Sequence, residues 1–295
     1  MPYTLKSDGL TVKVDSSGAE LTSIVANHTG REYLWQADPT FWKRHSPVLF
    51  PIVGSLWNGE YHYKKTAYPM SQHGFARDND FRLIRQSDDE IRFGFTDTEH
   101  TRKAYPFSFE LQIGYRLFQN KLEVIWQVIN KGGEDMYFQI GAHPAFFYPH
   151  FDPQGTGRGY FAFDKAEGIN YILIAQKGCA DTDTLHPLNL DEEGLLPIDV
   201  HTFDRDALII QDNQVQRVAL LDPSRRPFIT LHFDAPLVGL WSPPGRPDCP
   251  FVCIEPWYGR CDRVGYTGDI HGRDYMNRLA AGETFDASYT IEINK

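Results

Sequence analysis

Hydrophobic and polar residues alternate at every second position along many short segments of the chain. This alternation predicts β-strands that bury one face and expose the other. Gly, Asn, Asp or Pro residues bound the segments, as is typical of turns between strands. The predicted strands are TVKVD, ELTSIVA, EIRFGFTD, FELQIGYRLF, KLEVIWQVINK, VQRVALLD, PFITLHFD and SYTIEIN.

One pair of these segments also indicates how strands are joined. FELQIGYRLF and KLEVIWQVINK flank the short polar stretch Gln119-Asn120-Lys121. A turn at this stretch would pair the two strands antiparallel. The same alternation would then place Leu111, Ile113 and Tyr115 on one face.

Long helical periodicity is almost absent. DPTFWKRHS (residues 38–46) and HGRDYMNRLAAGE (271–283) are short helical candidates that we expect to be connectors. Residues 152–197, rich in Gly, Asp and Pro, are expected to form long loops over one end of the molecule. Many strands without intervening helices predict an all-β fold, a large antiparallel β-sandwich. We expect one domain spanning residues 1–295, because sandwiches of this length are common.

Composition narrows the functional classes. Aromatic residues make up 14% of the 295 residues, which suits both β-strands and sugar-binding clefts. The formal net charge of -10 argues against a nucleic-acid partner. The chain start lacks a secretory signal pattern, and no apolar run approaches the roughly 18 residues that span a bilayer. We therefore expect a cytoplasmic protein without a membrane partner, whose four cysteines are reduced, partly buried thiols.

Three stretches break the alternation by placing an ionisable residue beside Gly or Pro. They are QHGFARDNDF with His73 and Arg77, GAHPAFF with His143, and FVCIEPWYGR with Glu255. Proline follows both His143 and Glu255, so we expect extended backbone at each and strand pairing to stop there. Loops at strand ends are where sandwich proteins place binding and catalytic residues.

Each of these residues also has a purely structural interpretation. His73 or His143 taken alone is better explained as a hydrogen-bonded structural histidine. Glu255 lies between apolar FVCI and PWY, where burial would raise its carboxyl pKa toward that of a general base, but a buried ion pair with arginine is the alternative. Two histidines and a carboxylate without a nucleophilic Ser or Cys favour proton transfer. A metal bound by the two histidines and Glu255 is the rival, although no HxH or HExxH spacing supports it.

Several motifs in one order resemble the aldose 1-epimerase (galactose mutarotase) family, and most closely its LacX-like branch. They are SPVLFPIVGSLWNGEYHY, QHGFARDNDF, GAHPAFF, DRDALII, LVGLWSPP, FVCIEPWYGRCD and GDIHGRDYMNRLAAGETFDASYTIEI, which cover nearly the whole chain. The resemblance implies a galactose mutarotase-like supersandwich with a sugar cleft across one sheet and no cofactor. Its partner would be a small sugar, in a monomer or homodimer.

The resemblance also implies roles for individual residues. Glu255 matches the general base of the family and His143 its general acid, while His73 matches a histidine that contacts sugar oxygens. Opening the sugar ring requires one group to take the proton of the C1 hydroxyl and another to protonate the ring oxygen. Both groups must exchange these roles on the return path, which favours residues that gain and lose protons readily.

The sequence departs from the family pattern at one position. Ser55 follows FPIVG where relatives carry a substrate-binding arginine, so that contact is lost, replaced, or taken over by Arg44 or Arg77. Relatives also hold the sugar with an aspartate, for which Asp181 and Asp183 are candidates that no motif marks. Arg77 and the adjacent Asp78 have the alternative of an ion pair that locks the turn.

Trp257 and Tyr258 are candidate sugar-stacking rings, although core packing explains them equally well. We expect an aldose 1-epimerase acting on a hexose or related aldose. The alternatives are a hexose-phosphate mutarotase, in which arginines bind the phosphate, and a non-catalytic sugar-binding or regulatory protein on the same fold. A glycoside hydrolase ranks last, because it would require two acidic residues and only Glu255 is well marked.

Overall fold

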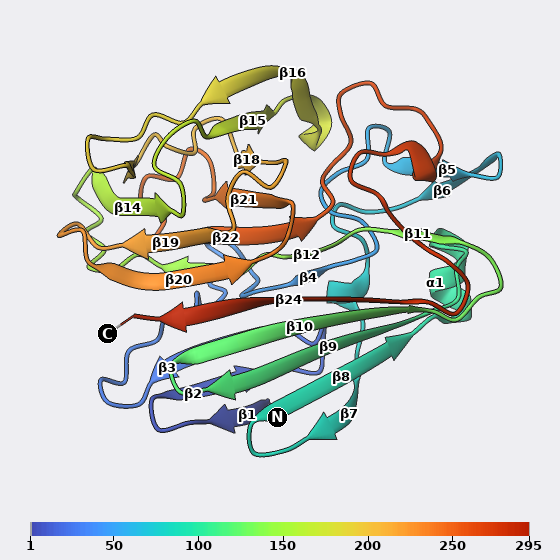
Figure 1. The fold of residues 1–295 in the computed structure, drawn as a ribbon, viewed down its shortest axis with the longest axis horizontal. Coiled ribbons are helices and arrows are strands. Elements are labelled where there is room, and N and C mark those ends of the chain that lie inside the picture. The colour runs from blue at the N-terminus through green and yellow to red at the C-terminus, as the bar shows by residue number, and fades with distance from the viewer. Residues whose placement is uncertain (1, 295) are drawn as a thin grey trace.

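The computed structural model describes residues 2–294, and its named strands pair antiparallel in two large sheets and three small ones (Figure 1). The nine-stranded sheet has the order β17 (Leu195–Asp199), β14 (Gly157–Phe163), β19 (Arg217–Leu221), β20 (Pro227–Phe233), β24 (Thr284–Ile293), β10 (Lys121–Asn130), β9 (Phe109–Phe118), β8 (Glu90–Thr96) and β7 (Arg82–Gln86). The eight-stranded sheet has the order β16 (Ala180–Pro187), β15 (Asn170–Ile174), β18 (Leu208–Ile210), β21 (Leu237–Trp241), β22 (Phe251–Tyr258), β12 (Ile140–Ala142) and β4 (Val48–Leu49), and β13 (Ala145–Phe147) also pairs with β22.

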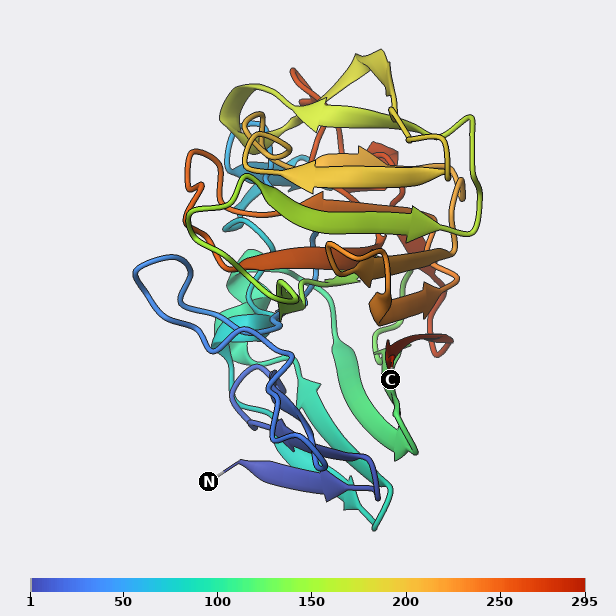
Figure 2. The same ribbon diagram turned by 90° about the vertical axis from the view of Figure 1, so that its left-hand side faces the viewer.

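Smaller elements surround these sheets. The small sheets are β1 (Tyr3–Lys6) with β2 (Leu10–Val14) and β3 (Leu21–Ala26), β5 (Glu60–Tyr63) with β6 (Thr66–Pro69), and β11 (Met136–Phe138) with β23 (Asn277–Leu279). The helical pieces are α1 (Glu99–Ala104), η1 (Ala76–Asp78), η2 (Gln176–Gly178) and η3 (Ile270–Gly272). In Figure 2 the dark blue N-terminal strands lie beside the teal strands of the nine-stranded sheet, where Tyr3 packs edge-on against Phe93.

The alternating segments are strands, which confirms the prediction of an all-β fold. β9 and β10 form the expected hairpin, in which Lys121 pairs with Phe118. Gln119 occupies the turn with a left-handed φ of 54°. Leu111, Ile113 and Tyr115 are all buried, as the alternation predicts.

Alternation on β22 separates the core from a second, outward-facing surface. Val252 and Ile254 belong to the main hydrophobic core, which combines residues of both large sheets. Cys253, Glu255 and Trp257 therefore point to the opposite face of the eight-stranded sheet, because successive side chains of a strand alternate. This outward face carries the candidate site described below.

The prediction of helix is wrong for most residues of the two expected connectors. Residues 38–46 contain turns and bends but no helix, because Phe41 and Trp42 pack on a small aromatic core and Glu20 Oε1 accepts hydrogen bonds from the backbone N–H groups of His45 and Ser46. Residues 271–283 keep a helical turn only at their start and then form β23. These contacts between distant segments cannot be read from local periodicity.

The prediction of long loops over residues 152–197 is also wrong. This region supplies β14 and β17 at one edge of the nine-stranded sheet and β15 and β16 at one edge of the eight-stranded sheet. Pro187 and Pro197 lie in the two outermost strands, β16 and β17. Edge strands tolerate Pro, Gly and charged residues, which weaken the alternating pattern by which central strands are recognised.

Two further expectations concern the surroundings of the chain. All four cysteines are free and buried, in agreement with the expected reduced thiols. Among residues 2–294, no helix has both the length and the apolar character needed to cross a membrane.

Candidate active site

A cavity of about 240 Å³ opens on the outward face of the eight-stranded sheet. This volume lies just below the usual range of ligand pockets, roughly 300–1,000 Å³, and suits one sugar ring better than an oligosaccharide. Its lining residues are Trp42, Val53, Gly54, Gln72, His73, Arg77, His143, Ile174, Gly178, Asp206, Ala207, Ile209, Trp241, Glu255, Trp257 and Cys261. The cavity therefore brings together five of the six site residues expected from the sequence: His73, Arg77, His143, Glu255 and Trp257.

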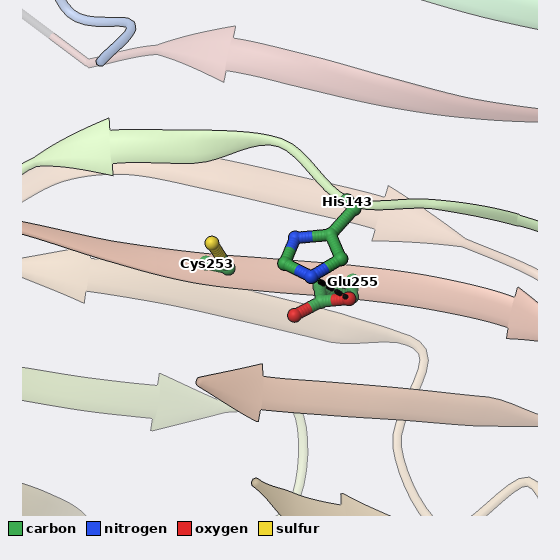
Figure 3. A group of neighbouring side chains, drawn as sticks. All are labelled: His143, Cys253 and Glu255. Carbon is green, nitrogen blue, oxygen red and sulfur yellow. Dashed lines mark ion pairs between the residues drawn. The ribbon is translucent and has the colours of Figure 1, made fainter. Parts of the chain in front are cut away.

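His143 and Glu255 face each other across a gap in strand pairing. β12 and β13 pair with β22 in a single register on either side of His143, which places this residue opposite Glu255. The Nε2 atom of His143 lies 3.4 Å from Oε2 of Glu255, and the two side chains are 9% and 2% exposed. Figure 3 shows the imidazole ring directly above the carboxylate.

The expectation that strand pairing stops at Glu255 is wrong, because β22 continues through Pro256 to Tyr258. Ile254 N–H donates to Pro144 O in the segment that joins β12 and β13. A non-proline residue at position 256 would direct its N–H toward the same segment, because every second residue of a strand faces the same partner. Its acceptor there would have been Ala142 O, which instead accepts a hydrogen bond from Trp257 Nε1 at 3.2 Å. The break occurs beside His143, as expected, and the proline in β22 leaves no acceptor unsatisfied.

Burial sets the protonation of the pair. It raises the pKa of Glu255 well above its usual value, and the charge of Asp206 raises it further. Burial, with a contribution from the charge of Arg77, lowers the pKa of His143 to about 3. Both shifts favour the uncharged forms of the pair, which are a protonated Glu255 carboxyl group and a neutral His143 imidazole.

Aromatic residues that the sequence analysis did not single out hold His143 in place. Trp42 stacks on the imidazole with a centroid distance of 4.7 Å and an interplanar angle of 27°. Trp241 contacts the imidazole edge-on at 5.4 Å. Trp42 lies in the stretch that was expected to be helical. Trp241 is the last residue of β21, within the motif LVGLWSPP. The Ser-Pro-Pro that follows it marks a strand end, which is the sequence signal that could have identified this tryptophan.

His73 is fixed by a turn that requires unusual backbone geometry. Its φ is 66° and that of Gly74 is 71°, both left-handed. A Cβ on Gly74 would lie 2.2 Å from Phe50 O, so only glycine fits there. Gly54 N–H donates to His73 Nδ1 at 3.1 Å, which leaves the proton of the neutral ring on Nε2. Burial lowers the pKa of His73 well below its usual value, so the ring acts as a neutral donor.

Arg77 and Arg44 occupy different positions relative to the cavity. Arg77 lines it and donates from Nη2 to Gln72 O. Arg44 lies outside the lining residues and pairs with Asp78 at 2.7 Å. The Arg77–Asp78 contact is 3.8 Å, so this pair is weaker than the one made by Arg44. In η1, Arg77 faces the cavity while Asp78 points to Arg44.

Asp206 is the aspartate that lines the cavity. It directly precedes Ala207 and β18 and has a left-handed φ of 71°. Asp181 and Asp183, the candidates from the sequence, lie on the edge strand β16 outside the lining residues. The motif DRDALII contains Asp206, and a carboxylate just before a buried apolar strand was the signal available in the sequence.

Trp257 forms the floor of the cavity, and glycines on both sides make room for its indole. A Cβ on Gly239 of β21 would lie 2.4 Å from the indole, and a Cβ on Gly141 of β12 would lie 2.6 Å from it. Tyr258 points to the opposite face and packs edge-on against Trp126 and Phe285, so core packing, the second of its two open interpretations, applies to it.

This packing gives a stability prediction. Gly239→Ala is expected to destabilise the fold by about 1–3 kcal/mol, because the new methyl group overpacks against the indole of Trp257. Gly133→Ala is the matched control, since no atom lies within 4 Å of its added Cβ, and should change stability by less than about 0.5 kcal/mol. Urea unfolding measures both, and equal midpoints for the two variants would contradict this account of the floor.

Ser55 lies beneath η2. Its Oγ is 2.7 Å from where a Cβ on Gly178 would be, and Gly178 lines the cavity whereas Ser55 does not. A longer side chain at position 55 would therefore collide with η2 unless that turn moved.

Two other features of the described residues compete with this cavity as the functional centre. One ligand atom each of His143, Cys253 and Glu255 lie within 4.8 Å of one another, and among residues 2–294 this is the group with metal-ligand geometry; His73 does not belong to it. A larger hollow of about 1140 Å³ is lined by residues such as Leu10, Phe118 and Phe228. In this hollow the carboxylate of Asp222 already forms an ion pair with Arg226. We therefore place the functional centre at His143 and Glu255.

Comparisons with known proteins identify the family and fold that this chain resembles. The sequence profile described as "Aldose 1-epimerase" matches residues 1–288. The plasmid-encoded protein LacX of Lactococcus lactis subsp. lactis is 29% identical over 301 residues, with 99% of both chains covered.

Two solved structures are similar over the whole chain. A galactose mutarotase related enzyme from Lactobacillus acidophilus has a TM-score of 0.92 and 36% identity, covering 100% of this chain and 98% of that one. A galactose mutarotase-like protein from Lactobacillus casei has a TM-score of 0.93 and 29% identity, covering 100% of both chains. The expected galactose mutarotase-like fold is thereby confirmed.

Proposed function

Because the chain belongs to the aldose 1-epimerase family, we propose that it interconverts the α and β anomers of a free hexose or a related aldose. One observation carries the proposal. His143 Nε2 and Glu255 Oε2 lie 3.4 Å apart, almost wholly buried, in the wall of a cavity sized for one sugar ring. A proton donor and a proton acceptor at this separation can act on two oxygens of a single ligand.

The reaction requires two proton movements. In the ring-opening step, Glu255 takes the proton of the C1 hydroxyl while His143 protonates the ring oxygen. The bond between C1 and the ring oxygen breaks, and C1 becomes an aldehyde. Rotation about the C1–C2 bond presents the other face of the aldehyde, and reclosure with the two proton transfers reversed yields the other anomer.

The neutral forms that burial favours hold the number of protons that this scheme requires. Protonated Glu255 with neutral His143 differs from carboxylate with imidazolium only by a proton transfer between the two groups. We infer that sugar binding promotes this transfer, because sugar hydroxyls donate hydrogen bonds to the carboxylate. The indole face of Trp42 would stabilise the imidazolium by a cation–π interaction.

The remaining polar residues of the wall are proposed to hold the sugar. His73 donates from Nε2 to a sugar oxygen, Asp206 accepts hydrogen bonds from hydroxyls, and Arg77 donates to an oxygen at the rim. Trp257 offers an apolar floor for the C–H face of the ring. Arg44 acts through Asp78 and the backbone of Arg77, to whose carbonyl it donates at 3.4 Å.

The Asp206 carboxylate favours an uncharged sugar over a sugar phosphate, because two anionic groups in a small cavity repel each other. Polarimetry of freshly dissolved α anomers tests both the reaction and the substrate class. The protein should accelerate the approach to anomeric equilibrium for at least one neutral aldose of a panel that includes glucose, galactose and their 6-phosphates. Saturable sugar binding without acceleration would instead favour a non-catalytic sugar-binding protein.

Asp206→Asn should raise the KM for the sugar about tenfold or more, because a charge-assisted hydrogen bond contributes about 1.5–3 kcal/mol. Asp204→Asn is the control from the same motif. It removes an exposed carboxylate that pairs with His201 outside the cavity, so the KM should not change. Initial rates over a range of sugar concentrations measure both variants. An unchanged KM in Asp206→Asn would rule out this contact.

A further inference from the structure

A third side chain faces the acid–base pair. Cys253 and Glu255 are two residues apart on β22, so both point to the outward face of the sheet, and His143 lies opposite Glu255. One ligand atom of each residue lies within 4.8 Å of the other two. Figure 3 shows the thiol beside the imidazole and the carboxylate below the ring.

Two atoms of this group have no hydrogen-bond partner among residues 2–294. They are Oε2 of Glu255 and Nδ1 of His143, both buried. The Glu255 side chain is only 2% exposed, and its Oε2 is directed at the imidazole. A buried acceptor without a donor is uncommon and leaves a lone pair available to a cation.

The three ligand types match the preferences of one class of ion. Imidazole nitrogen, thiolate sulfur and carboxylate oxygen are the ligands of Zn²⁺, and three protein ligands with an open fourth position are common. Mg²⁺ and Ca²⁺ prefer oxygen alone. With bonds of about 2.0–2.3 Å, tetrahedral zinc holds its ligand atoms roughly 3.5 Å apart. The His143–Glu255 distance of 3.4 Å already matches, and the thiol sulfur lies within 4.8 Å of a ligand atom of each.

The charges also balance. A dication bound by one thiolate, one carboxylate and a neutral imidazole forms a neutral unit, which reduces the cost of placing it among these three buried side chains. The ion displaces the thiol proton and the carboxyl proton to solvent.

We propose that His143, Cys253 and Glu255 form a binding site for a thiophilic divalent cation, Zn²⁺ foremost, and that its occupation blocks anomer exchange. The block follows because the ion takes the lone pairs of both proton-transferring groups. The effect on rate rests on the proposed function, whereas the binding itself does not.

Substitution of Cys253 distinguishes metal binding at this site from the proposed anomer exchange. Cys253 does not line the cavity and has no part in the proton transfers, so Cys253→Ser should leave anomer exchange nearly unchanged without metal. Cys249→Ser is the matched control, because Cys249 is also buried but its thiol donates to Phe251 O instead of facing the pair.

Binding is tested with Co²⁺, which replaces zinc and absorbs in the near ultraviolet when bound to a thiolate. Wild type and Cys249→Ser should show this absorption, and Zn²⁺ should remove it. Cys253→Ser, or Cys253→Ala if the serine variant does not fold, should lack it. Absence of the absorption in wild type, or its persistence in both Cys253 variants, would overturn the site.

Inhibition is tested by adding Zn²⁺ to the anomer-exchange assay. Zinc should inhibit the wild type reversibly, with recovery on adding EDTA, and Cys253→Ser should require at least about tenfold more zinc. Equal zinc sensitivity of wild type and Cys253→Ser would refute the proposal. A wild type without exchange in the absence of metal would instead contradict the proposed function, and the cobalt measurement would still decide whether the site exists.

Discussion

Glu255→Gln is expected to lower kcat for anomer interconversion about a hundred- to ten-thousandfold, the usual contribution of a positioned general base. Glutamine keeps the size of the side chain but cannot take the proton of the C1 hydroxyl or give it back. Because the side chain also loses a buried ionisable group, the fold should not be destabilised. The rate of anomer exchange at equilibrium, followed by NMR magnetisation transfer, measures the effect.

The control for this substitution is Glu60→Gln, which changes a half-exposed glutamate outside the cavity. Its exchange rate should equal that of the wild type. If Glu255→Gln retained the wild-type rate with an intact fold, Glu255 would not be the base.

His143→Asn is expected to lower kcat by a similar factor, because asparagine occupies part of the ring volume but cannot gain and lose a proton near neutral pH. KM should change much less, since His73 and Asp206 are proposed to hold the sugar. Initial rates over a range of sugar concentrations separate the two parameters. His150→Asn, an exposed change seven residues away outside the cavity, should leave both unchanged. A large rise in KM at constant kcat would make His143 a binding residue only.

The sequence was most informative about the centres of the two sheets. Strands such as β9 and β10 have a buried and a solvent-facing side, so alternation reveals them. The alternation did not reveal β17, because this edge strand accepts Pro197 without losing a central ladder bond. It did not reveal β14, whose register with β17 shifts between Gly157 and Gly159. The conformation of the segment around Trp42 was not predicted for a different reason. Its backbone is held by a hydrogen bond to Glu20, a residue far away in the sequence.

The sequence predicted those site residues that lie in a recognisable motif. It did not predict the residues whose role depends on tertiary contacts. The motifs marked His143 and Glu255, and the structure faces them across one gap in strand pairing. Asp206 is positioned by a left-handed backbone conformation, which the local sequence pattern does not predict. Trp42 reaches His143 only through the folding of a loop, and Tyr258 points away because it falls on the opposite side of β22 from Glu255.

The central claim is that His143 and Glu255 act as one proton-transferring unit. The most direct test is the anomer-exchange rate of the double variant Glu255→Gln/His143→Asn, compared with the wild type and both single variants. Residues that act as a unit are strongly non-additive, so the double variant should exchange anomers no more than a few times slower than the slower single variant. Single variants that retain the wild-type rate, or losses that multiply in full, would contradict it.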